Sequence, residues 1–141
     1  MAAIPALWYF VPVASLVALL SAYLFFRSMI KMPEGTSRMR EIAQYVKEGA
    51  FAYLSRQYKT VSIVFALLFL VFVVLAILGI QNPFVPIAFL TGGFFSGLCG
   101  FLGMKTATSA SSRTAAGAQS SLNKGLVIAF RSGAVMGLVV V

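Results

Sequence analysis

Residues 61–80 read VSIVFALLFLVFVVLAILGI, a stretch that contains no charged side chain. An α-helix rises about 1.5 Å per residue, so a run of this length crosses the roughly 30 Å hydrocarbon core of a bilayer. The whole chain has a similar character, because 60% of its 141 residues are hydrophobic and 10% are charged. A soluble domain usually carries about 25% charged residues. The sequence therefore predicts an integral membrane protein.

Three further apolar runs, at about residues 5–30, 87–104 and 125–141, predict three more transmembrane helices. The first is too long for a signal-peptide core, and its basic residues Arg27 and Lys31 lie at its C-terminal end rather than in front of it, so we expect a retained span. The predicted fold class is all-α, an integral membrane protein with four transmembrane helices in one membrane region, 1–141. Because the chain stops inside an apolar run at Val141, we expect a fragment of a larger protein.

The segments between the spans are the most polar parts of the chain. In residues 31–60, Thr36 or Ser37 is expected to cap a short amphipathic helix at the membrane surface. Gly49 is expected to end that helix, and a second helix from Ala50 leads into the next span. Residues 105–124 are rich in alanine, which predicts helices that extend beyond the bilayer and pack closely there. The dipeptide Asn82-Pro83 predicts a tight turn between the second and third spans.

Small residues are concentrated in the third and fourth spans. Gly93 and Gly97 form a GxxxG motif in the third span. Small residues recur every four positions in the fourth, at Gly125, Ala129, Gly133 and Gly137. Such faces allow two helix backbones to approach closely, so we interpret them as packing faces rather than as a ligand or ion path.

The charge of the chain is strongly positive, with eleven Lys and Arg against three acidic residues. Most of the basic residues lie in segments 31–60 and 105–124, and the turn at 81–86 has none. The positive-inside rule then places both basic segments in the cytoplasm and the N-terminus outside. We expect anionic lipid rather than nucleic acid as the partner of these charges, because no soluble module presents them. Arg131 lies in the fourth span and must snorkel, pair, or face the protein interior.

The side chains of the usual catalytic centres are scarce. The sequence has no His and no Asp, so a Ser-His pair is impossible, and Glu34, Glu41 and Glu48 all lie in one segment. We interpret Glu41 and Glu48 as solvated charges beside Arg and Lys rather than as a metal pair. Cys99, the single cysteine, is expected to be a buried packing thiol. The sequence therefore predicts no catalytic, cofactor-binding or metal-binding residue in this chain.

Three stretches resemble a known family. Residues 48–60 read EGAFAYLSRQYKT, residues 103–115 read GMKTATSASSRTA, and residues 129–137 read AFRSGAVMG. In this order they resemble the N-terminal part of the membrane-integral inorganic pyrophosphatases, which are pyrophosphate-energised sodium or proton pumps.

The resemblance implies that the intact protein is an inorganic pyrophosphatase that exports sodium, or protons, across the plasma membrane. It implies Mg²⁺ as cofactor, K⁺ and Na⁺ as further ions, and a homodimer of many-helix subunits. The four spans would belong to an outer ring, with the substrate site and ion gate outside this stretch. The fragment alone is then expected to be inactive.

Two alternatives stay open on the residues alone. The chain could be a small membrane scaffold or accessory subunit without catalysis. It could also be one repeat of a secondary transporter, which predicts an inverted copy of these spans downstream. The sequence beyond Val141 distinguishes the three.

Overall fold

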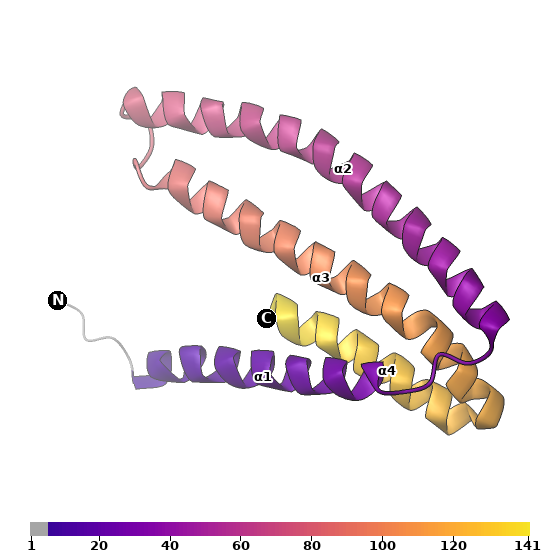
Figure 1. Ribbon diagram of the computed structural model, residues 1–141. Helices are drawn as coiled ribbons and strands as arrows, with labels where there is room; N and C mark the ends of the chain where they lie inside the picture. The colour runs from indigo at the N-terminus through magenta and orange to yellow at the C-terminus, as the bar shows by residue number, and fades with distance from the viewer. Residues whose placement is uncertain (1–5) are drawn as a thin grey trace.

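The computed structural model describes residues 6–141, and these residues form helices joined by short connections. A 3₁₀ turn, Ala6–Tyr9, precedes four α-helices: α1 (Phe10–Ile30), α2 (Ser37–Ile77), α3 (Val85–Ser120) and α4 (Leu122–Val140) (Figure 1). All four are long and apolar enough to cross a membrane. The predicted all-α fold is therefore confirmed, while Pro5, the predicted start of the first span, lies outside the described residues.

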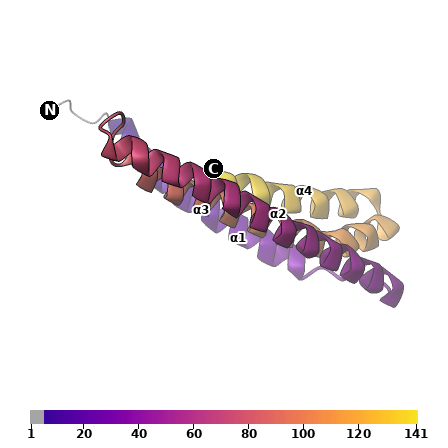
Figure 2. The same cartoon turned by 90° about the horizontal axis from the view of Figure 1, so that it is seen from above.

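The helices alternate in direction and lie in the spatial order α2, α3, α4, α1. α3 packs against both α2 and α4, and α1 packs mainly against α4. Within residues 6–141, α1 and α2 make no helix-to-helix contact although they are consecutive in the chain. Figure 1 shows the α1–α2 connection and the α3–α4 turn at the same end of the bundle, and Figure 2 shows the helices following a common long axis.

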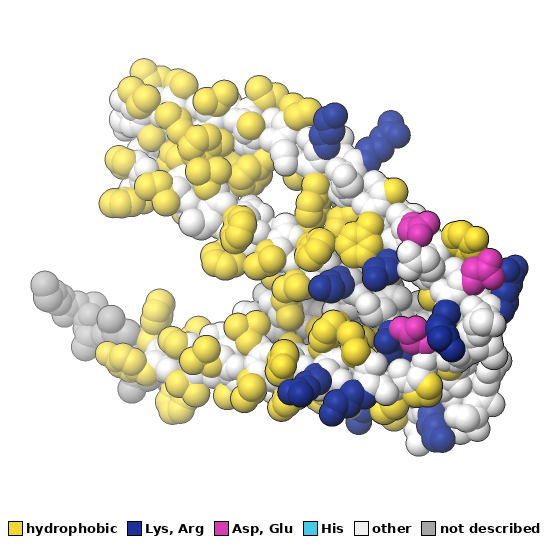
Figure 3. All heavy atoms as spheres, in the orientation of Figure 1, with side chains coloured by type: hydrophobic (Ala, Val, Ile, Leu, Met, Phe, Trp, Pro, Cys, Tyr) yellow, Lys and Arg dark blue, Asp and Glu magenta, His cyan; other side chains and the backbone are white. Residues whose placement is uncertain are grey.

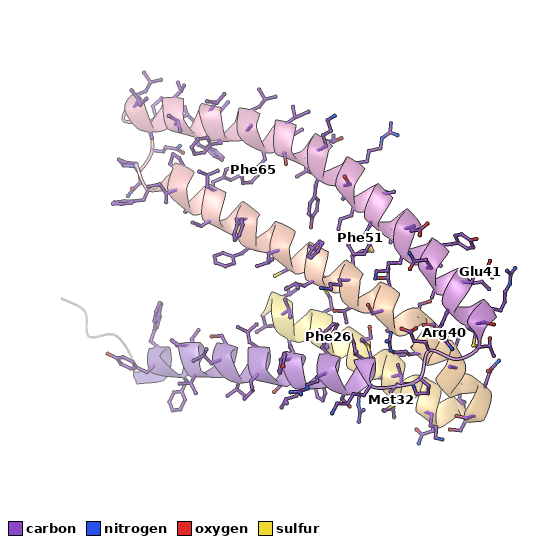
Figure 4. The ribbon with its side chains drawn as sticks, viewed as in Figure 1. Phe26, Met32, Arg40, Glu41, Phe51 and Phe65 are labelled. Carbon is purple, nitrogen blue, oxygen red and sulfur yellow. The ribbon has the colours of Figure 1, made fainter. Side chains whose placement is uncertain are left out.

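Helix α2 is continuous over 41 residues, and Gly49 lies in its interior. The predicted break at Gly49 is therefore wrong, and the residues predicted as a separate short surface helix form the first part of α2. One glycine costs a helix only about 1 kcal/mol, and the residues that follow it are held against α3. The ring of Phe51 contacts that of Phe101 edge to face at 5.8 Å, and Leu54 is buried (Figure 4). At about 1.5 Å per residue, α2 is roughly twice as long as the hydrocarbon core is thick.

The close-packed part of the bundle lies at the end that contains the α3–α4 turn. Met29, Ala110 and Ile128 form its core, one residue from each of three helices. The buried residues of α3 lie mainly in its second half: Gly103, Thr106, Thr108, Ala110, Ser112 and Arg113. The prediction of closely packed helices after Lys105 is therefore confirmed, whereas most of residues 61–80 is exposed on the bundle.

The connections follow the local signals in the sequence. Thr36 caps α2, and its side chain accepts a hydrogen bond from the Met39 N–H at 3.3 Å. In the turn between α2 and α3, the Phe84 N–H donates to the Asn82 side chain at 2.9 Å. Both predictions are confirmed. Gly35 adopts a φ of 85°, a left-handed conformation that other residues rarely take, and so lets the chain turn from α1 into α2.

Candidate functional site

Charged side chains gather at one end of the bundle, over the α1–α2 connection, the first half of α2 and the second half of α3 (Figure 3). We call this part, residues 27–59 and 105–131, the basic end. Hydrophobic side chains cover most of the remaining surface in the same view. This distribution makes the basic end the part of the chain where polar chemistry can occur.

Arg113 is the most enclosed charge of the basic end, with 9% of its surface exposed. Its guanidinium contacts the Glu34 carboxylate at 2.7 Å. It also donates to the carbonyl of Ile30 at 3.3 Å and to that of Ser109. The Ile30 carbonyl is at the C-terminal end of α1, where helix carbonyls lack intrahelical partners and a cation is favourable. Arg113 therefore holds the end of α1 and the connection after it against α3.

This ion pair was not predicted from the sequence. Glu34 lies in the connection after α1. Arg113 lies far along the chain, 83 positions after Ile30, in a segment rich in Ala, Ser and Thr. No spacing rule links two residues so far apart. The signal that could have indicated a buried pair was Arg113 itself, a single arginine in a segment of small residues.

The other two glutamates are exposed. Glu41 pairs with Arg38 at 2.7 Å, and their side chains are 47% and 74% exposed. Glu48 accepts a hydrogen bond from Gln44 at 2.8 Å, and both residues are exposed. In the described part of the chain, no three His, Cys, Asp or Glu residues come together in a way that could hold a metal ion.

Arg131 of α4 pairs with a neighbouring helix. Its guanidinium donates to the Ser28 hydroxyl of α1 at 2.7 Å and is partly buried. We expected this charge to snorkel, to pair or to face the protein interior, and in the structure it pairs. The contact lies beside Arg27, at the same end of α1 as the Arg113 interactions.

Glycine contacts bring α3 close to both of its neighbours. A Cβ at Gly93 would meet the Phe65 ring of α2, and a Cβ at Gly103 would meet the Met136 side chain of α4 (Phe65 in Figure 4). Gly125 of α4 lies against Ala118, where a Cβ would come within 3.1 Å of the α3 backbone. The predicted packing faces are confirmed at these positions.

The fourth-span face is used only in part within the described residues. A Cβ at Gly133 or Gly137 would meet nothing within 4 Å. Cys99, which we expected to be buried, is half-buried, and its thiol lies 3.6 Å from the Val139 carbonyl of α4.

A cavity of about 320 Å³ lies in the basic end, between α2, α3 and the end of α1. Its charged lining residues are Glu34, Arg40, Lys47, Lys105 and Arg113. We call it the basic pocket. Lys and Arg side chains donate hydrogen bonds and carry positive charge, so this pocket suits an anion and not a metal ion.

Comparison with known proteins identifies the relatives of this chain. Residues 16–141 match the family model described as inorganic H⁺ pyrophosphatase. The K⁺-stimulated pyrophosphate-energized sodium pump of Thermotoga maritima is 37% identical over an alignment of 140 residues, which covers 96% of this chain. A Bacteroides thetaiotaomicron protein named "Putative K(+)-stimulated pyrophosphate-energized sodium pump" is 61% identical over 136 residues, which is 96% of the chain. The K⁺-insensitive pyrophosphate-energized proton pump 2 of Moorella thermoacetica is 45% identical over 130 residues, or 92%.

The chain spans 18% of the length of each of these three relatives. The family match extends over nearly all of it, from α1 through α4. The resemblance of the three sequence stretches is thereby confirmed, and the four apolar helices make this a multi-pass membrane protein. The chain belongs to the inorganic H⁺ pyrophosphatase family.

Proposed function

We propose that this chain is the N-terminal part of a pump that couples pyrophosphate hydrolysis to sodium export across the plasma membrane. The observation that carries the proposal is the 61% identity to the Bacteroides protein, which is named as a sodium pump. The proton is the alternative cargo. The Moorella proton pump, at 45%, is more similar to this chain than the Thermotoga sodium pump, at 37%.

Within such a pump, we propose that these four helices form an outer scaffold. The buried polar residues support this role, since Thr106, Thr108 and Arg113 all bond to backbone carbonyls. The uncovered small face of α4, at Gly133 and Gly137, offers a surface on which further helices can pack closely. A homodimer of subunits larger than this chain is part of the same proposal.

The residues present do not fit a magnesium site. Mg²⁺ prefers an octahedral set of oxygen ligands, usually with carboxylates. Glu34 and Glu41 each pair with an arginine, and Glu48 lies on the exposed face of α2. We therefore assign Mg²⁺, and the K⁺ and Na⁺ that act on the pump, to ligands outside this chain.

The test is transport by the protein encoded by the whole reading frame that contains this sequence. Purified and reconstituted into vesicles, it is expected to hydrolyse pyrophosphate with Mg²⁺ and to accumulate sodium in the lumen. Sodium uptake should persist with a protonophore present, and adding K⁺ tests stimulation.

Acidification of the lumen without sodium would instead make the cargo a proton. Absence of any pyrophosphate-driven ion movement would contradict the pump itself. As a control, the 141-residue chain alone should neither hydrolyse pyrophosphate nor move ions.

We further propose that segments 31–60 and 105–124, which make up most of the basic end, lie in the cytoplasm and that the N-terminus lies outside. The charge distribution supports this orientation, because basic flanks are retained on the cytoplasmic side. With Cys99→Ala as background, Lys47→Cys should react with an impermeant thiol reagent only from the cytoplasmic side. Asn82→Cys, in the turn at the opposite end of α2, is the control and should react only from outside. The reverse pattern would refute this orientation.

A further inference from the structure

The basic pocket has more positive than negative groups in its walls. Arg40 and Lys47 come from α2, Lys105 and Arg113 from α3, and Glu34 is the single carboxylate (Arg40 in Figure 4). Three cationic side chains therefore remain after Arg113 and Glu34 pair with each other. Like charges gathered around one cavity repel, and an anion bound among them would offset that repulsion.

The remaining cations have no carboxylate partner in the part of the chain that the structure describes. The two ion pairs there are Arg38–Glu41 and Arg113–Glu34, so neither includes Arg40, Lys47 or Lys105. Ser109 and Ser112 also line the pocket, and within residues 6–141 neither hydroxyl donates a hydrogen bond. Two α2 cations, one α3 cation and two hydroxyls are thus available to a ligand.

We propose that the basic pocket binds a phosphate group. Lys and Arg form short, charge-assisted hydrogen bonds to phosphate oxygens, and Ser hydroxyls add neutral donors. A volume of about 320 Å³ accommodates a small anion or a single head group. This binding site is separate from the pumping activity proposed above. Phosphate binding in the pocket does not require that activity and does not explain it.

Two sources of the phosphate group share this chemistry. One is a soluble anion such as inorganic phosphate. The other is the head group of an anionic lipid, which the position of the pocket allows. Lys105 directly follows the apolar residues 98–104 of α3, where a helix leaves the hydrocarbon core and meets the head groups. The experiment therefore uses one probe for each source.

The test compares two double variants of the whole protein, purified in detergent. Lys47→Gln with Lys105→Gln removes two pocket cations, both on exposed residues, so folding should be preserved. Arg56→Gln with Lys59→Gln is the matched control, because it removes two exposed cations of α2 that do not line the pocket. Native mass spectrometry counts retained phosphatidylglycerol, and thermal unfolding reports the effect of added inorganic phosphate.

The wild type and the control are expected to bind at least one probe. The pocket variant should bind it about tenfold more weakly for each lost charged hydrogen bond. Lys47→Arg with Lys105→Arg keeps the charges and should retain binding, and unfolding without probe checks that every variant is folded.

Each outcome decides the proposal. Loss of phosphatidylglycerol alone supports a lipid head group, and loss of the phosphate-induced shift supports a soluble anion. If neither probe binds the wild type, or if both double variants bind alike, the proposal is overturned. A carboxylate from another part of the protein that fills the pocket would produce the first of these negative results.

Discussion

Replacing Arg113 with alanine is expected to lower the free energy of unfolding by about 2–3 kcal/mol. The Arg113 side chain is 11% exposed, and its guanidinium bonds to Glu34 and to two backbone carbonyls, one of them at the end of α1. Removing one partner of a buried ion pair costs about 3–5 kcal/mol. The value here should lie below that range, because Glu34 is 43% exposed and water can solvate it in the variant.

A second arginine–glutamate pair of equal length provides the control. Arg38 and Glu41 are also 2.7 Å apart, but both side chains are largely exposed. Arg38→Ala should therefore cost less than about 1 kcal/mol. Denaturation of the two purified variants in the same detergent gives the comparison. Equal losses would mean that burial of Arg113 does not determine the strength of its contacts.

Introducing leucine at Gly125 is expected to cost about 2–3 kcal/mol. This glycine lies where the first turn of α4 packs against the end of α3, and an added Cβ would be 2.9 Å from the Ala118 Cβ and 3.1 Å from its Cα. A backbone cannot rotate away as a long side chain can, so the two helices must separate. Overpacking of this kind costs about 1–3 kcal/mol in well-packed interiors.

Gly49→Leu is the matched control for Gly125→Leu. Gly49 also lies inside a helix, but a Cβ there would meet nothing within 4 Å. Leucine is a better helix former than glycine, so this variant should be as stable as the wild type or more stable, by up to about 1 kcal/mol. The same thermal-unfolding measurement serves both. A loss at Gly49 as large as that at Gly125 would show that contact between α3 and α4 is not the cause.

Features that depend on neighbouring residues were predictable from the sequence. The length of the apolar runs predicted the helices, Thr36 predicted a cap, and Asn82-Pro83 predicted a turn. Each signal lies within a few residues of its structural effect. The packing role of Gly93 was predictable in kind, although its partner, Phe65, was not.

Features that depend on distant residues were not predictable. Gly49 has an unfavourable local preference, but α2 is continuous through it and the residues that follow it contact α3. The Glu34–Arg113 pair and the basic pocket join α2 or the α1–α2 connection to α3. From the sequence, charge content predicted only that these residues form a basic surface. In the fold, the antiparallel arrangement of α2 and α3 places them around one cavity.

The separation of α1 from α2 has a consequence for biosynthesis. The hydrogen bond that joins Ser28 of α1 to Arg131 of α4 links positions 103 residues apart. At about 5–20 residues per second, the ribosome needs roughly 5 to 20 seconds to synthesise that interval. During this time α1 lacks its main partner α4, while α2 and α3, which pack against each other, can already pair. Lipid therefore surrounds α1 during this interval, and the long apolar surface of α1 is suited to contact with lipid.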